Sequence, residues 1–213
     1  MRRDGRNHLF GMLISLDMNN RMRTITLEEH FVTESFLRAM GAYGNATPAW
    51  LEALQPKLLD LGAGRIAAMD DAGIDLQVLS LAAIGFDALD VPTATSLASD
   101  VNDELAAAVR ANPSRLAGFA CLALKDPESA AQELERSIKK LGFRGVLLDG
   151  TTAGKFLDDP QFAPVFEAAV ALNIPIYLHP APPPEAVFWH ECVEFGNVLP
   201  EAFSTVVVNL VWT

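Results

Sequence analysis

The chain has 213 residues, half of them hydrophobic, which is enough to form the core of one globular domain. Its net charge of -11 and its pI near 4.7 exclude a broad surface for nucleic acid, because phosphate binding needs clustered Lys and Arg. No stretch is long and apolar enough to span a membrane, and two cysteines, Cys121 and Cys192, cannot build a disulfide framework.

The first 21 residues differ from the rest of the chain. They combine a basic start, a short apolar run at Leu9–Leu16 and a polar end. This resembles a weak signal peptide, but the apolar run is short and no small-residue cleavage site follows it. We therefore favour a poorly ordered extension over residues 1–21, ahead of one domain over residues 22–213. The cysteine content separately predicts a reducing, cytoplasmic location.

From Met22 onward, short β-branched runs alternate with longer segments of helical period. Strands are predicted at Thr24–Glu28, Leu76–Leu81, Leu116–Leu124, Arg144–Asp149, Ile174–His179 and, more weakly, Thr205–Trp212. Helices are predicted at Ser96–Ala111, Pro127–Leu141 and Phe162–Val170, where apolar residues recur every three or four positions. Such alternation is typical of βαβ units with a parallel sheet.

Turn residues support these boundaries. Asn112-Pro113 is expected to end one helix, and Gly142 another. Asp126-Pro127 and Asp159-Pro160 each place an N-capping carboxylate before a proline of the first turn, so both are predicted helix starts. Cys121 lies inside an apolar run, where we expect a buried, reduced thiol.

Two parallel folds fit this pattern, an open doubly wound sheet and a (β/α)8 barrel of the TIM type. The first strand leads into Glu28-Glu29-His30-Phe31 and not into a glycine-rich phosphate-binding turn, which favours the barrel. A complete barrel takes ~250 residues. We therefore expect an incomplete barrel with five to six βα units.

Functional side chains of parallel βα folds gather at the carboxyl ends of the strands. Glu28 and His30 are two residues apart in an extended segment, so both side chains should point the same way, and Glu29 should point oppositely. His179 ends an apolar strand. An E-x-H triplet is common by chance and a strand-end histidine can be a packing residue, but their joint placement favours a ligand set for Zn, Mn or Fe.

Other polar and aromatic residues have simpler explanations. Asp87 and Asp149 follow predicted strands and could contact a substrate, but capping of a turn is favoured. Residues expected in a solvated face or an ion pair are Arg65, Asp70 and Asp71, and residues expected at the surface or in local packing are His8 and His190. Aromatic residues expected in the core, although they could line the barrel mouth, are Phe31, Trp50 and Phe86.

Several motifs, in order along the chain, are similar to the amidohydrolase-related family that includes γ-resorcylate, 2,3-dihydroxybenzoate and aminocarboxymuconate-semialdehyde decarboxylases. The motifs are Thr26-Leu27-Glu28-Glu29-His30-Phe31, Met69-Asp70-Asp71-Ala72-Gly73-Ile74-Asp75 leading into Val78-Leu79-Ser80, Gly142-Phe143-Arg144-Gly145-Val146, Phe156-Leu157-Asp158-Asp159-Pro160 and Ile176-Tyr177-Leu178-His179-Pro180. The resemblance runs nearly continuously from Met22 to about Val187, and the Glu-Glu-His form is most similar to the hydroxybenzoate branch.

This resemblance implies a (β/α)8 barrel with one divalent metal, Zn or Mn, held by Glu28, His30 and His179 and by an aspartate of strand eight. That aspartate and the family's strand-six histidine have no counterpart in this sequence, so the catalytic residues stay unassigned. The implied reaction is the non-oxidative decarboxylation of a hydroxylated aromatic acid. The metal holds the carboxylate and phenolic oxygens, the ring carbon is protonated and carbon dioxide leaves.

The missing positions leave alternatives open. Three ligands should bind a metal more weakly than four, and an unpaired strand edge favours aggregation or pairing with another chain. We therefore expect the 213-residue chain to be poorly stable or inactive unless a partner segment completes it, and a complete protein to form homo-oligomers. A metal-dependent hydrolase of the same superfamily and a non-catalytic truncated barrel are the alternative functions.

Overall fold

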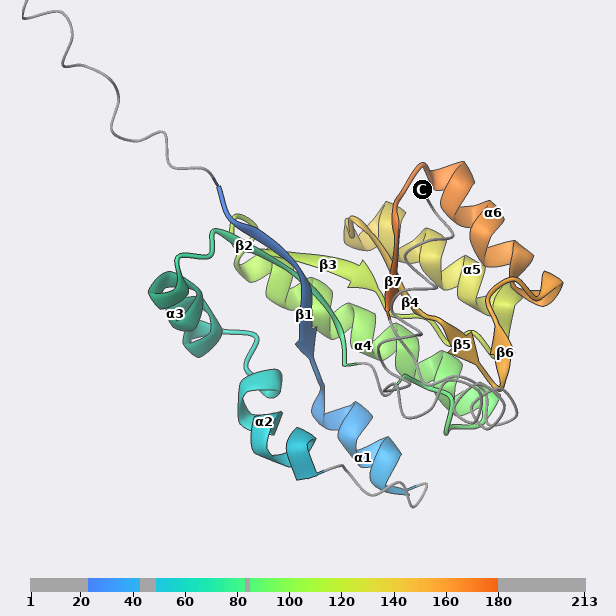
Figure 1. Ribbon diagram of the computed structural model, residues 1–213, viewed down its shortest axis with the longest axis horizontal. Coiled ribbons are helices and arrows are strands. Elements are labelled where there is room, and N and C mark those ends of the chain that lie inside the picture. The colour runs from blue at the N-terminus through green and yellow to red at the C-terminus, as the bar shows by residue number, and fades with distance from the viewer. Residues whose placement is uncertain (1–22, 43–48, 83–84, 180–213) are drawn as a thin grey trace, which may run out of the picture.

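The computed structural model describes residues 23–42, 49–82 and 85–179, and within them the main feature is one parallel sheet (Figure 1). Its five strands lie in the order β1-β2-β3-β4-β7. Their bounds are Ile25–Phe31 for β1, Leu76–Leu81 for β2, Leu116–Ala120 for β3, Gly145–Asp149 for β4 and Ile176–His179 for β7. Each strand of this sheet pairs in parallel with the next strand in this order.

Helices connect these strands. The helices are α1 (Glu34–Ala42), α2 (Ala49–Leu59), α3 (Ala63–Ala72), α4 (Val91–Ala111), α5 (Pro127–Arg136) and α6 (Ala163–Leu172). A π-helical turn, Ser137–Leu141, extends α5, and a short hairpin of β5 (Thr151–Thr152) and β6 (Lys155–Phe156) follows β4. Helix α4 packs on β3, and α5 packs against α6. No helix in the described ranges is long and apolar enough to cross a membrane.

The predicted helix boundaries are confirmed where capping residues set them. The carboxylate of Asp126 accepts a hydrogen bond from the Ser129 amide at the start of α5, and Asp159 caps the 3₁₀ turn before α6. Asn112 ends α4, and Gly142 ends the π-helical turn with a left-handed φ of 77°, which favours glycine. The start of α4 was placed too late, because Asp90 caps it ahead of Val91.

The predicted strands are present, with shifts at their ends. Strand β2 has the expected bounds, and β1 continues three residues past its predicted end at Glu28. Strand β3 stops at Ala120, although the apolar run continues buried to Leu124. An apolar run reports burial and not sheet pairing, which explains the overestimate. The predicted sixth strand, Thr205–Trp212, and the extension over residues 1–21 lie outside the described residues.

The sheet separates two apolar layers. The larger layer lies between the sheet and the helices and contains Leu79, Leu116, Leu134, Phe162 and Val165. On the opposite face of the sheet, a smaller cluster consists of Val78, Ala117 and Phe119, with Leu76, Leu147 and Tyr177 packed against it. Four consecutive parallel βα units followed by the fifth strand, with these two layers, are the expected incomplete (β/α)-barrel architecture, and the small cluster lies on the face that a barrel encloses.

Candidate metal centre

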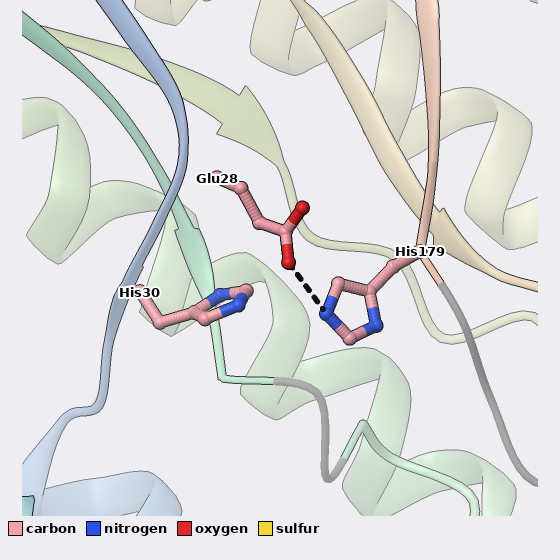
Figure 2. Close-up of side chains that lie close together, drawn as sticks. All are labelled: Glu28, His30 and His179. Atoms are coloured by element: carbon pink, nitrogen blue, oxygen red, sulfur yellow. Dashed lines mark ion pairs between the residues drawn. The ribbon is translucent and has the colours of Figure 1, made fainter. Parts of the chain in front are cut away.

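Glu28, His30 and His179 lie together although they come from the two edge strands of the sheet. One ligand atom from each lies within 4.8 Å of the others. Figure 2 shows the Glu28 carboxylate pointing at the His179 ring, with the His30 ring alongside. Since β1 and β7 are the outermost strands in the sheet order, this contact requires a sheet that curls toward closure.

A β-bulge places Glu28. Thr26 is opposite Gln77 and Glu29 is opposite Leu79, so two residues of β1, Leu27 and Glu28, share a single position of β2. Bulges are frequent beside functional sites, where the extra residue redirects a side chain. The Glu28 side chain is 49% exposed, whereas that of His179 is 13% exposed. The carboxylate therefore lies at the open side of the cluster.

His30 is held as a neutral imidazole. Burial lowers its pKa most, and the charge of His179 lowers it further, against weaker opposing effects led by Glu28. The Ser80 hydroxyl lies 3.2 Å from Nδ1 of His30 and 3.5 Å from the Glu29 carbonyl. A hydroxyl that donates to the carbonyl can accept the Nδ1 proton, which leaves Nε2 unprotonated, as a metal ligand must be.

His179 lies between two carboxylates. Its Nε2 is 3.6 Å from Oε1 of Glu28, and its Nδ1 is 3.4 Å from Oδ1 of Asp149, its direct neighbour across the β4–β7 pair. Oδ1 of Asp149 is buried and has no hydrogen-bond partner among the described residues. The ring of His179 also meets that of His30 edge to face, with centroids 5.2 Å apart.

Tyr177 completes the cluster, and the sequence reasoning did not single it out. Its hydroxyl donates a 2.6 Å hydrogen bond to Oε2 of Glu28. That bond is the main cause, and burial the second, of a pKa of Tyr177 that is raised to about 12. The phenol therefore stays protonated at neutral pH. The signal was available, since Tyr177 precedes His179 by two residues and must share its face of β7.

This donor set fits a single divalent cation. One hard carboxylate and two borderline imidazoles form a mixed ligand set suited to Zn or Mn. Metal–ligand bonds near 2.1 Å place two ligand atoms of one cation roughly 3–3.5 Å apart, and the Glu28 and His179 atoms are already 3.6 Å apart. The unsatisfied Asp149 oxygen beside His179 provides the acceptor that ligating histidines use on their second nitrogen.

The two other aspartate candidates have different positions. Asp87 accepts a 2.8 Å hydrogen bond from the Ala153 amide and so holds the turn between β5 and β6. This turn is distant along the chain, whereas the favoured prediction was a cap of the turn that follows β2. Burial raises the pKa of Asp87. Asp149 caps no turn in the described structure, because its carboxylate faces His179.

The prediction for Arg65 was wrong. Its guanidinium is not part of a solvated face, because it donates to the backbone carbonyls of His30, Lys57 and Asp60. It thereby fixes the end of β1 next to the cluster. Asp70 forms the expected ion pair, with Arg115 at 2.7 Å.

The remaining assignments concern packing. Phe31, Phe86 and Cys121 are buried in the core, as expected. Desolvation raises the pKa of the Cys121 thiol to about 12, so it is protonated at neutral pH. Side chains that lie outside the described part of the chain are those of His8, Trp50, His190 and Cys192.

The chain is similar to known aromatic-acid decarboxylases. It is 40% identical over 166 residues to the γ-resorcylate decarboxylase of Polaromonas sp. strain JS666, which covers 75% of this chain and 50% of that protein. The dihydroxybenzoic acid decarboxylase structure from Polaromonas sp. JS666, with bound manganese and 2-nitroresorcinol, matches with a TM-score of 0.70 and 35% identity, over 87% of this chain and 59% of that one.

A second solved structure supports the same relationship. The 5-carboxyvanillate decarboxylase from Novosphingobium aromaticivorans DSM 12444, complexed with manganese, matches with a TM-score of 0.71 and 31% identity, over 86% of this chain and 58% of that one. The chain spans about half the length of the curated relatives it matches. Residues 30–207 match the amidohydrolase family along most of the sequence. The parallel barrel units, the motifs and this match together show that the chain belongs to the amidohydrolase family.

Proposed function

We propose that this chain carries the metal-binding half of a metal-dependent decarboxylase of hydroxylated aromatic acids, with Glu28, His30 and His179 as ligands of one divalent cation. The observation that carries the proposal is the meeting of these three ligand atoms within 4.8 Å at the carboxyl ends of β1 and β7. The decarboxylase activity of the relatives supports the choice of reaction. Manganese is the preferred cation, because two of the similar structures contain it.

The residues of the cluster have separate roles in this proposal. A bound divalent cation would supply a Lewis-acidic template for the carboxylate and phenolic oxygens of the acid. Neutral His30 presents Nε2, with its Nδ1 proton held by Ser80, and His179 presents Nε2, with Asp149 beside Nδ1. In the overall reaction the carboxyl group leaves as carbon dioxide, its bonding electrons stay on the ring carbon and a proton takes its place.

Titration of the 213-residue chain with Mn²⁺ tests the proposal. Electron paramagnetic resonance of free Mn²⁺ gives the stoichiometry, which should be one per chain and should fall to none when Glu28, His30 and His179 are replaced together by Ala. Addition of γ-resorcylate should change the signal of the bound ion more than addition of benzoate, which lacks the phenolic oxygens. A chain that binds no Mn²⁺, or one that does not distinguish the two acids, would contradict the proposal.

Turnover separates the candidate reactions. Loss of γ-resorcylate with release of carbon dioxide, dependent on Mn²⁺, supports a decarboxylase that is active in this chain. Hydrolysis of a lactone or ester by the same preparation would instead support the hydrolase alternative. Acid binding without turnover would leave this chain as a binding half that needs further residues for catalysis, as the sequence analysis expects.

We further propose a cytoplasmic location and a homo-oligomeric assembly for the complete protein. The buried, reduced Cys121 supports a reducing compartment. Light scattering after size-exclusion chromatography measures the assembly, and a strictly monomeric complete protein would contradict it.

A further inference from the structure

We propose that Tyr177 is a positioning residue, which fixes the Glu28 carboxylate so that a single oxygen faces the cation. This inference rests on the proposed function, because it concerns the ligand role of Glu28. The observation that carries it is the division of the two carboxylate oxygens between two partners. Oε2 accepts the Tyr177 hydroxyl at 2.6 Å, and Oε1 lies 3.6 Å from Nε2 of His179.

Glu28 needs such a partner more than the histidines do. Its side chain is 49% exposed and belongs to a β-bulge, so packing constrains it little. A free glutamate of this kind samples several rotamers, and ordering it on a metal costs side-chain entropy. A hydrogen bond that already holds the carboxylate lowers this cost before any cation arrives.

Tyr177 is itself well fixed. Strand β7 pairs Tyr177 with Leu147 of β4, and the phenol ring stacks on Phe119 of β3 with centroids 5.9 Å apart and planes 23° apart. The ring therefore stands on the apolar cluster of the enclosed face, and only its hydroxyl reaches the polar cluster. A rigid ring with a polar tip suits a group that aims another side chain.

The contact also chooses how Glu28 can bind. A carboxylate with both oxygens free can chelate one cation through both of them. The bond from the phenol to Oε2 turns the carboxylate so that its other oxygen, Oε1, lies on the side of His179. One carboxylate oxygen and two imidazole nitrogens would hold a bound cation and would leave further coordination positions for other ligands, the oxygens of the acid among them.

A purely structural role is the competing explanation, because the Tyr177–Glu28 bond joins the two edge strands of the sheet. The two roles differ in what they change. A structural link would alter only the stability of the metal-free chain. A positioning residue alters the affinity for the cation and the number of oxygens that bind it, at equal folding.

The test uses the full chain, Mn²⁺ for affinity and Co²⁺ for spectroscopy. Tyr177→Phe keeps the ring and its stack on Phe119 and removes only the hydroxyl. We expect it to weaken Mn²⁺ binding about 10-fold or more, the usual effect of losing a partner of a ligand. We also expect weaker visible absorption by bound Co²⁺, because chelation through both oxygens of Glu28 raises the coordination number.

Ser129→Ala is the matched control. It also removes a hydroxyl that donates to a carboxylate, that of Asp126 at 2.7 Å, but at the start of α5 and away from the cluster. Its Mn²⁺ affinity and Co²⁺ spectrum should equal those of the unmodified chain. Circular dichroism of the metal-free variants establishes equal folding, and if Tyr177→Phe is unfolded, Tyr177→Trp provides a second ring without the hydroxyl.

Three outcomes are distinct. Weaker Mn²⁺ binding with an altered Co²⁺ spectrum in the tyrosine variant alone supports the positioning role. Tight binding by the unmodified chain, with affinity and spectrum unchanged in a folded tyrosine variant, overturns this inference and leaves the proposed function intact. An unmodified chain that binds neither cation overturns the proposed function, and the positioning role with it.

Discussion

Two clusters of polar side chains lie in this molecule, and the geometry of their contacts differs. Between α4, β3 and α5, the Asn102 side chain exchanges two 2.9 Å hydrogen bonds with the backbone of Cys121 and donates a third, of 2.7 Å, to Glu133. Arg136 then joins Glu133 and Asp103, each at 2.7 Å. In the candidate metal centre the distances from His179 to the carboxylates of Asp149 and Glu28 are 3.4 and 3.6 Å, and one buried oxygen of Asp149 has no described hydrogen-bond partner.

The difference separates stability from function. A buried polar network stabilises a fold when every member is satisfied, and the Asn102 network meets this condition. Long contacts and an unused acceptor cost stability, unless a further group uses the free lone pairs. Mutations in the first cluster should therefore change the free energy of unfolding of the protein. Mutations in the second cluster should change the affinity of the protein for a cation.

The largest expected effect is on metal binding. His179→Ala removes one of the three proposed ligands, so Mn²⁺ affinity should fall by more than the roughly 100-fold upper limit for losing a partner of a ligand. Equilibrium dialysis against Mn²⁺ measures the loss. If a folded His179→Ala chain kept the affinity of the unmodified chain, His179 would not be a ligand, and the contrast between the clusters would fail.

Asn102→Ala tests the other cluster. It leaves the buried amide and carbonyl of Cys121 without their partner, and each unsatisfied group costs about 1–3 kcal/mol. We expect a loss of about 2–3 kcal/mol in the free energy of unfolding, measured by urea denaturation. Mn²⁺ affinity of the folded variant should not change. A loss of affinity equal to that of a ligand variant would show that the clusters are coupled.

Both clusters lie in an architecture that the sequence predicts, and Glu28, His30 and His179 of the candidate metal centre are predicted as well. Tyr177 of the same centre is not. The spacing of the apolar residues located the strands. Glu28, His30 and His179 were expected together because all three lie near the carboxyl ends of parallel strands. The β-bulge at Glu28 was not predictable, because it depends on pairing with β2. The contacts of Asn102 and Arg65 were not predictable either, because these side chains bond to backbone groups that are distant in the sequence.

A smaller effect is expected at Ser80, which is fully buried and contacts Nδ1 of His30. Ser80→Ala should lower Mn²⁺ affinity by about 10-fold, the low end for a partner of a ligand, because the Nδ1 proton loses an acceptor. Ser137→Ala is the matched control. Ser137 is also fully buried, but its hydroxyl bonds to Glu133 in the helical layer. An equal loss of affinity in both variants would attribute the effect to general destabilisation.

The smallest expected effect is on the pH dependence of stability, and it also distinguishes the clusters. Burial lowers the pKa of His30 below its ordinary value of 6.5, so the unfolded chain binds the proton more tightly than the folded chain. The contribution of neutral His30 to the free energy of unfolding is therefore fully present above pH 6.5, and it is lost as the pH falls through the lowered pKa of the folded chain. The charged groups that act on His30 are His179, Glu28 and Asp149.

Urea unfolding of the metal-free chain between pH 5.5 and 7.5 measures this loss. Burial raises the pKa of Asp87 above 3.8, so the stability that its neutral form contributes is lost as the pH rises through the raised pKa, and Asp87 opposes the trend of His30. His30→Gln should flatten the slope, because it removes the titrating group and keeps a polar side chain of similar length. Asn102→Ala should lower the whole curve without changing its slope. A His30→Gln chain with the unmodified slope would place the proton uptake on another residue.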